Sequence, residues 1–245
     1  MSRPLSSGAT PAVAARSAAS DGERELKFTF PAARAHVVRR RLESTCRRDR
    51  DFPAAIVWTV YYDTPALVSL GEKINSDFLK RKIRVRWYSD VDGRVSGPAF
   101  VEAKARVGTR RLKTRERLPV RAEEVAQWSL QDARFLSFPS LLRDHGVLRH
   151  ESWLPVMRIR YRRDRFIEPL SQSRVSLDSD IAAVEVNPRL FSNGDLSPLP
   201  RAVLEVKGLG DRLPAALQPL LQFDLRKRSF SKFLAVYAHT MRRVF

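Results

Sequence analysis

The sequence predicts an α+β fold, a single domain built on an antiparallel sheet of about eight strands. Strand-forming segments recur along the 245-residue chain, and helical segments lie before, between and after them. Within the strands, charged residues fall on alternate positions, as in the segments FVEAK and VLEVK. Because successive side chains of a strand point to opposite faces, this spacing places the charges of each strand on one face of the sheet.

The first half of the chain is predicted to contain five strands, at 23–30, 56–63, 81–88, 99–106 and 111–120. Pro31 ends the first strand, and residues 32–47 have the composition of a helix. Residues 67–79 are typical of a turn or a short helix. The DVDG turn at 90–93 predicts a hairpin between the strands on either side of it, which favours antiparallel pairing.

The second half begins with predicted helices in place of strands. Helical segments are predicted at 122–128 and 140–148, joined by a proline-containing link. Three further strands are predicted, at 156–166, 174–181 and 202–208. Residues 214–245 lack a good strand pattern and predict one or two helices. Residues 1–20 combine Ser, Ala, Pro and Arg without any acidic residue, which predicts a disordered tail before a single domain over 21–245.

Charge is the unusual part of the composition. The chain has 45 Lys and Arg against 27 Asp and Glu, a net charge of +18, which indicates an anionic partner such as nucleic acid, an acidic membrane surface or a phosphorylated molecule. The single cysteine, Cys46, excludes an intramolecular disulfide and fits a reducing compartment, so we expect a cytoplasmic protein. The sequence shows neither a run of about 18 apolar residues nor a secretory signal.

The alternating charges predict where the anion binds. Most of them are basic, as at Arg84 and Arg86, and they recur on strands from the whole chain. If these basic faces fold toward one another, they form a cavity suited to a polyanion. The simpler interpretation is the solvated face of an ordinary antiparallel sheet. Some strands carry a carboxylate two residues from a Lys or Arg, as in Glu102 and Lys104. These carboxylates favour the interpretation as a polyanion-binding cavity over that of a solvated face.

Other kinds of site find little support in the sequence. One cysteine and four scattered histidines cannot supply a zinc site, and no Walker loop, Rossmann glycine set or kinase signature is present. RNA binding is better motivated, because four aromatic residues near basic strands could stack bases: Trp87, Tyr88, Tyr161 and Phe166. The strand carboxylates would repel a nucleic-acid backbone, however, and nucleic acid is therefore not expected. Beside many cations, such carboxylates are suited to hold a divalent metal that bridges phosphate oxygens.

Several short segments of the chain, taken in order, resemble a known family. ERELKF at the start is similar to the E-x-E-x-K strand of the triphosphate tunnel (CYTH-type) enzymes. It is followed, in order, by YYDTP, RKIRVRWY, FVEAK, LKTRERL, YRRDRF, RVSLDSD, VLEVK and FSKF. This ordered series resembles the VTC domain, the polyphosphate polymerase branch of the same superfamily, over roughly residues 23–237.

The resemblance implies an antiparallel β-barrel that forms a tunnel, with helices packed outside and a C-terminal helix. Matched by motif, the residues that would grip phosphate groups and serve catalysis are Lys27, Arg84, Arg86, Lys104, Lys113, Arg163, Arg174 and Lys232. Tyr161 and Lys207 would line the tunnel beside the substrate. Glu205 matches the family's metal-holding glutamate, and Glu25 is a second candidate ligand for Mn²⁺ or Mg²⁺. The implied substrates are ATP and polyphosphate.

Several alternatives stay open at this stage. The same cations would serve a polymerase, a triphosphatase or a non-catalytic polyphosphate-binding module. The alternation of Arg158, Arg160 and Arg162 places them on one face of a strand, whereas the family match selects Tyr161 and Arg163 on the other. Asp178 is either a second metal ligand or a turn-side acid, and Glu23 and Glu25 are either metal ligands or partners of nearby arginines. A membrane partner protein, as in better-known members of the family, is not encoded in this chain.

Overall fold

The computed structural model describes residues 23–108, 110–145, 152–191 and 194–242. Its strands are β1 (Arg24–Pro31), β2 (Arg47–Arg48), β3 (Ala54–Asp63), β4 (Leu79–Ser89), β5 (Pro98–Val107), β6 (Arg110–Arg121), β7 (Leu154–Ile167), β8 (Arg174–Val186), β9 (Arg201–Gly208) and β10 (Arg226–Lys227). Its α-helices are α1 (Ala35–Thr45), α2 (Val68–Ile74), α3 (Ala122–Gln127) and α4 (Lys232–Thr240), and its 3₁₀ helices are η1 (Ala32–Arg34), η2 (Ala133–His145) and η3 (Ala215–Phe223). The tail predicted over residues 1–20 lies outside the described residues.

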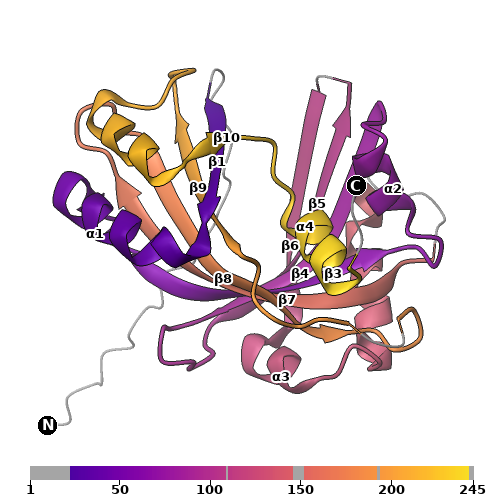
Figure 1. Ribbon diagram of the computed structural model, residues 1–245. Coiled ribbons are helices and arrows are strands. Elements are labelled where there is room, and N and C mark those ends of the chain that lie inside the picture. The colour runs from indigo at the N-terminus through magenta and orange to yellow at the C-terminus, as the bar shows by residue number, and fades with distance from the viewer. Residues whose placement is uncertain (1–22, 109, 146–151, 192–193, 243–245) are drawn as a thin grey trace, which may run out of the picture.

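One antiparallel sheet contains all of these strands, which confirms the predicted fold class. Its order is β10-β1-β9-β8-β7-β3-β4-β5-β6, with β2 paired to β7. In Figure 1, β3 and β7 cross the base of the molecule and the remaining strands rise on its two sides. We call these sides the β1 wall (β1, β8 and β9) and the β4 wall (β4, β5 and β6). Within the described residues β6 and β10 are the two ends of the sheet and do not pair, so the barrel is not closed by hydrogen bonds.

Three of the differences between the structure and the predicted elements have a clear physical reason. The helix predicted over 32–47 ends at Thr45, because Arg47 and Arg48 pair with Ile167 and Phe166 of β7. The C-terminal stretch, predicted to lack strands, contains the two-residue β10, which pairs with β1. The segments around Pro139 and Pro219 form 3₁₀ helices, since proline removes a hydrogen-bond donor from a regular α-helix.

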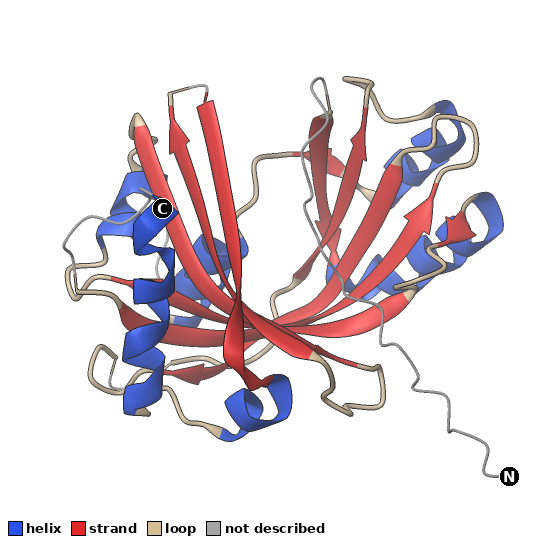
Figure 2. Ribbon diagram, turned by 180° about the vertical axis from the view of Figure 1, so that it is seen from behind, coloured by secondary structure: helices blue, strands red, loops and turns tan. Residues whose placement is uncertain are grey.

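The outer face of the sheet is apolar and is covered by helices, as Figure 2 shows from behind. On the β4 wall, Val85 and Trp87 pack with residues of α3 and η2 such as Phe135. On the β1 wall, Phe28 and Leu204 pack in a second cluster with residues of α1 and η3. These residues alternate along their strands with charged ones, so burying them turns the charges toward the space between the walls. We call this second surface the inner face.

A third apolar cluster lies where the two walls meet at the base of the sheet. It joins Tyr61 of β3 and Tyr161 of β7 to Phe233 and Tyr237 of α4. The rings of Tyr61 and Phe233 are stacked, with centroids 4.9 Å apart. α4 therefore packs over part of the inner face and leaves the rest to polar residues. No helix in the described parts of the chain is long and apolar enough to cross a membrane.

Candidate functional site

The β4 wall supplies a row of charged residues to the inner face. Arg84 of β4 lies opposite Glu102 of β5, which in turn lies opposite Arg115 of β6. Arg84 Nε donates to Glu102 Oε2 at 2.7 Å, and Arg115 Nε lies 3.3 Å from Oε1. Burial raises the pKa of the Glu102 carboxyl, but the charges of Arg84, Arg86 and Arg115 outweigh this and hold the pKa well below its usual range. Glu102 is thus an anion shared among three arginines.

The β1 wall presents two carboxylates and two ammonium groups side by side. Glu25 of β1 lies opposite Lys207 of β9, and Lys27 lies opposite Glu205. Lys207 Nζ is 3.1 Å from Glu205 and 3.7 Å from Glu25, while Lys27 Nζ is 3.4 Å from Glu25. Burial raises the pKa of Glu205, but a hydrogen bond with Glu25 and the charges of Lys27, Arg163 and Lys207 bring it well below its usual value. Glu205 is therefore an ionised carboxylate in a basic setting.

This pair of carboxylates fits a divalent cation that shares its ligands with substrate. Mg²⁺ is commonly bound through one or two carboxylates together with substrate phosphates, and Glu25 and Glu205 offer that donor set. In the described parts of the chain there is no group of three or more His, Cys, Asp or Glu residues that could hold a metal ion. The remaining ligands would have to be phosphate oxygens or water.

A third cluster links the base of the sheet to α4. Arg163 Nε and Nη2 donate to the two oxygens of Asp178 at 2.6 and 2.7 Å, and Lys232 Nζ lies 2.5 Å from Asp178 Oδ2. Burial raises the pKa of Asp178, but the charges of Arg163 and Lys232 lower it to about 2. Lys232 Nζ also lies over the ring of Tyr161, 4.7 Å from its centroid. Asp178 lies within β8, so its interpretation as a turn-side acid is wrong.

Lys104 shows that the two walls face each other. Its pKa is lowered to about 7, first by the charge of Arg84 in its own wall, then by burial, and then by Lys207 of the opposite wall and by Arg86. Lys104 keeps solvent access, so the neighbouring cations rather than burial are the main cause of the lowered pKa. An ammonium group that so many cations destabilise is one that an anion would stabilise strongly.

The structure brings most of the predicted residues to this surface. Their side chains lie on the inner face: Glu25, Lys27, Arg84, Arg86, Lys104, Tyr161, Arg163, Glu205, Lys207 and Lys232. Lys113 lies opposite Lys104 and is exposed. Arg174 lies opposite Lys207, but its side chain is 55% exposed and pairs with Glu23. Lys113 and Arg174 thus border the cluster, and Glu23 is engaged by an arginine.

β7 presents Tyr161 and Arg163, and not Arg158 or Arg162, to the inner face. Arg158 binds Trp128 and Glu185 near α3, and Arg162 binds Asp164 on the outer side. The pairing of β7 with β3 is regular from Arg158 to Arg163, so the alternation along β7 is unbroken and places Tyr161 and Arg163 on the face opposite to Arg158 and Arg162. The register shifts between β7 and β8 leave this alternation unchanged.

The predicted aromatic residues do not form one stacking surface. Trp87 and Phe166 belong to the two outer clusters. Tyr161 is buried against α4, and of the four residues only Tyr88 is appreciably exposed to solvent on the inner face. Because a single-stranded RNA surface needs several accessible rings, this arrangement weakens the RNA-binding alternative.

The inner face also carries cations that the motif match did not select. We call Lys73, Lys80 and Lys82 the lysine end: burial lowers the pKa of Lys73, and the charges of Lys80 and Lys27 lower it further. We call Arg115 and Arg165, together with the motif-matched Arg86, the arginine end, because all three lower the pKa of Tyr88 against the opposing effect of its burial. Lys82, Arg115 and Arg165 continue the alternation of Arg84, Lys113 and Arg163, so the period of two could have identified them.

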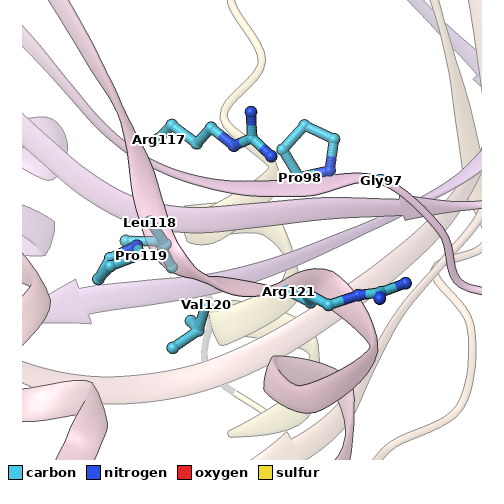
Figure 3. A pocket seen from close by; sticks show the side chains of 7 residues that line it. All are labelled: Gly97, Pro98, Arg117, Leu118, Pro119, Val120 and Arg121. Atoms are coloured by element: carbon cyan, nitrogen blue, oxygen red, sulfur yellow. The ribbon is translucent and has the colours of Figure 1, made fainter. Parts of the chain in front are cut away.

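A pocket is present at the end of β6 away from Lys113 (Figure 3). It is lined by Gly97, Pro98, Arg117, Leu118, Pro119, Val120 and Arg121. Arg117 lies opposite Phe100, next to a register shift in the β5–β6 pairing, and Arg121 pairs with Glu123. None of the residues predicted for the site lines this pocket. The pocket is therefore distinct from the cluster between the walls.

The geometry agrees with the comparison of the chain with known families. The model of the VTC domain matches residues 23–241. The chain belongs to the VTC domain family. No curated protein matches it by sequence.

Three solved structures that match this VTC domain are distant from it in sequence. A "putative adenylate cyclase" from Vibrio parahaemolyticus is 12% identical, with a TM-score of 0.44, over 86% of this chain and 95% of the other. A second "putative adenylate cyclase", from Bacillus halodurans, is 12% identical with a TM-score of 0.47 and the same coverage. The Schizosaccharomyces pombe Mediator head module is 11% identical, with a TM-score of 0.36, over 82% and 91% of the two chains.

Proposed function

We propose that this VTC domain binds ATP and polyphosphate between its walls and transfers the γ-phosphate of ATP to a growing polyphosphate chain. The observation that carries the proposal is the length of the row of cations on the inner face. We call this row the cationic track: it runs from the lysine end through Arg84, Lys104 and Arg163 to the arginine end. Lys80 of the lysine end and Arg86 of the arginine end are six positions apart on β4, a distance of about 20 Å at about 3.3 Å per residue. A track of that length favours a ligand longer than one triphosphate group.

The chemistry of the track matches such a ligand. A polyanion with one charge per phosphate needs several fixed cations, and arginine offers two-point contacts where lysine offers a point charge. In the middle of the track, Arg84 and Lys104 come from the β4 wall and Arg163 comes from β7 at the base of the sheet. They would neutralise the charge on the transferred group, and Asp178 would hold Arg163 in place through its paired hydrogen bonds. Phosphoryl transfer depends mainly on such positioning and neutralisation.

Glu205 and Glu25 would hold Mn²⁺ or Mg²⁺, which when bound polarises the γ-phosphate. The reaction itself needs no covalent step on the protein. An oxygen of the chain's terminal phosphate forms a bond to the γ-phosphorus, and the bond from that phosphorus to the β–γ bridging oxygen breaks in line. The bridging oxygen leaves with the electron pair as part of ADP, and the chain is one phosphate longer.

The decisive experiment is incubation of the pure protein with ATP and Mn²⁺ or Mg²⁺, with products separated by gel and by ³¹P NMR. A ladder of chains with matching ADP release supports the polymerase. Free orthophosphate or pyrophosphate without chains would instead indicate a triphosphatase that uses water as nucleophile. Salt-sensitive polyphosphate binding without turnover would leave a binding module.

The proposal also bears on partners and compartment. With ATP as donor and Cys46 as a free thiol, the proposal places the reaction in the cytoplasm. Carboxylates interleaved with the cations, such as Glu102 and Glu205, disfavour nucleic acid as the ligand. A membrane partner that takes up the product is compatible with the proposal and would be supplied by another chain.

A further inference from the structure

The segment between β10 and α4 connects the two walls. At its start, the Arg228 backbone N–H donates to the Lys27 carbonyl of β1 at 3.0 Å. Lys73 Nζ then donates to Ser229 Oγ at 3.2 Å, and Lys82 Nζ of β4 donates to Ser231 Oγ at 2.7 Å. In Figure 1 this segment is the yellow stretch that runs from β10 to α4. Within the described residues β6 and β10 do not pair, so no backbone hydrogen bonds join the two walls at these edges. The segment joins the two walls there through its own hydrogen bonds.

Three consecutive residues at the start of α4 contact three different strands. Ser231 accepts from Lys82 of β4, Lys232 pairs with Asp178 of β8, and Phe233 stacks on Tyr61 of β3. The position of Lys232 on the inner face therefore depends on how the first turn of α4 is held.

Ser231 is the residue that holds this turn. It is the N-cap of α4, and its side chain accepts a hydrogen bond from the Leu234 backbone N–H at 3.4 Å. The same oxygen accepts from Lys82, and Ser231 is buried, with 8% of its surface exposed. A serine side chain at this position satisfies a backbone donor that would otherwise lack a partner in the helix.

We propose that Lys82 and Ser231 are positioning residues: Lys82 fixes the Ser231 hydroxyl, the hydroxyl fixes the first turn of α4, and the turn keeps Lys232 on Asp178 and over Tyr161. This inference rests on the proposed function only in assuming that Lys232 belongs to the phosphate track. Neither Lys82 nor Ser231 needs to touch the phosphate chain.

The surroundings of Lys82 support this role. Burial lowers its pKa to about 8; ionised Tyr61 would oppose this, while Arg84, Lys73 and Lys27 add to the lowering. The groups that face Lys82 are thus largely cationic, and its hydrogen-bond partner is the Ser231 hydroxyl rather than a carboxylate. A lysine kept in such a setting is consistent with a hydrogen-bonding role toward Ser231.

The first test uses serine substitutions two residues apart in one segment. Ser231→Ala is expected to weaken binding of long polyphosphate by about fivefold, the factor by which losing an N-cap typically shifts a helix toward its unfolded form, and to raise KM by a similar factor. Ser231→Thr should restore binding, because threonine also caps helices. Ser229→Ala is the matched control: it loses an exposed hydrogen bond to Lys73 but no helix cap, and it should keep most of the affinity for polyphosphate. If Ser231→Ala lowers the melting temperature without changing polyphosphate affinity, the positioning role is wrong.

The second test separates Lys82 acting through Ser231 from Lys82 acting on phosphate directly. Polyphosphate affinity is measured by calorimetry for Lys82→Gln, Ser231→Ala and the double variant. If Lys82 acts only through Ser231, the losses of affinity from the two substitutions are not additive. The double variant should then bind polyphosphate no more weakly than the weaker-binding of the two single variants. Fully additive losses would mean that Lys82 binds phosphate itself and would overturn the inference. These are binding measurements, so a protein that releases no ADP refutes the polymerase proposal while leaving this test intact.

Discussion

Lys27 of β1 and Glu205 of β9 lie directly opposite each other, with the lysine Nζ 3.7 Å from Glu205 Oε2. Lys207 approaches the other oxygen of the same carboxylate, Oε1, at 3.1 Å. A carboxylate held between two ammonium groups keeps its charge over the whole neutral pH range, and it can exchange those contacts for a metal ion when phosphates arrive to occupy the lysines.

The first prediction concerns this carboxylate. Glu205→Gln should abolish turnover of ATP, because the amide cannot hold a divalent cation as the carboxylate does. Polyphosphate binding without metal should persist or strengthen, since a negative charge is removed from the track. Glu23→Gln is the control, because Glu23 pairs with Arg174 at the border of the cluster, and it should keep most of the turnover. Unchanged turnover in Glu205→Gln would refute the metal assignment.

The second prediction concerns the shared anion of the β4 wall. Glu102→Gln leaves Arg84, Arg86 and Arg115 without their common carboxylate, and removing one partner of a buried ion pair costs about 3 kcal/mol or more. The melting temperature should therefore fall, whereas Glu123→Gln, which changes an exposed pair, should have little effect. Saturating polyphosphate should bring the melting temperatures of Glu102→Gln and the unaltered protein closer together. A gap that polyphosphate does not narrow would place these arginines outside the ligand site.

The third prediction is a pH dependence of binding. Lys104 has a pKa of about 7, so it is protonated at pH 6 and largely neutral at pH 9. A bound polyanion favours its charged form and raises this pKa. Binding should thus take up protons between pH 7 and 9, and affinity should fall as the pH rises through that window. Calorimetry in buffers of different ionisation enthalpy measures the uptake, which Lys104→Met should reduce. No proton uptake at pH 8 would contradict the prediction.

The fourth prediction separates the arginine end from the middle of the track. Arg165→Gln should weaken binding of long polyphosphate by about tenfold, a typical loss for a hydrogen bond to a charged group, while tripolyphosphate binding changes little. Arg121→Gln, in the pocket beyond the end of the track, serves as the control and should affect neither ligand. Equal losses for the long and the short ligand would mean that Arg165 acts on the middle of the track.

The period of two in the strands explains what could be predicted from the sequence. The alternation predicts that Lys27, Lys104 and Glu205 lie on the charged face of their strands, whereas their roles are implied by the family resemblance. Lys27 and Glu205 alternate with apolar residues buried on the outer face, such as Phe28 and Leu204. The same reasoning covers Lys82 and Arg165, which lie one period outside the positions selected by motif.

The parts that the sequence did not predict depend on contacts between distant segments. The alternation along β7 does not by itself show which of its faces turns inward; this depends on outer-side contacts with other elements, such as that of Arg158 with Glu185 of β8. β2 and β10 are two residues long each, too short for a periodic pattern. The Lys82–Ser231 contact joins residues 149 positions apart, and the failure of β6 to pair with β10 is a property of the whole sheet.

The unpaired edges give the site a mechanical property. In a closed barrel, any change in diameter breaks backbone hydrogen bonds. Here the spacing between the walls can change while only side-chain contacts are broken or formed. The β4 wall and the base of the sheet carry cations such as Arg84, Lys104 and Arg163, and the β1 wall contributes Lys27 and Lys207. A polyanion that contacts cations of both walls draws the walls together. The bound polyanion would thus hold the two walls closer together along the unpaired edges of the sheet. Small-angle scattering should detect a smaller radius of gyration once polyphosphate is bound.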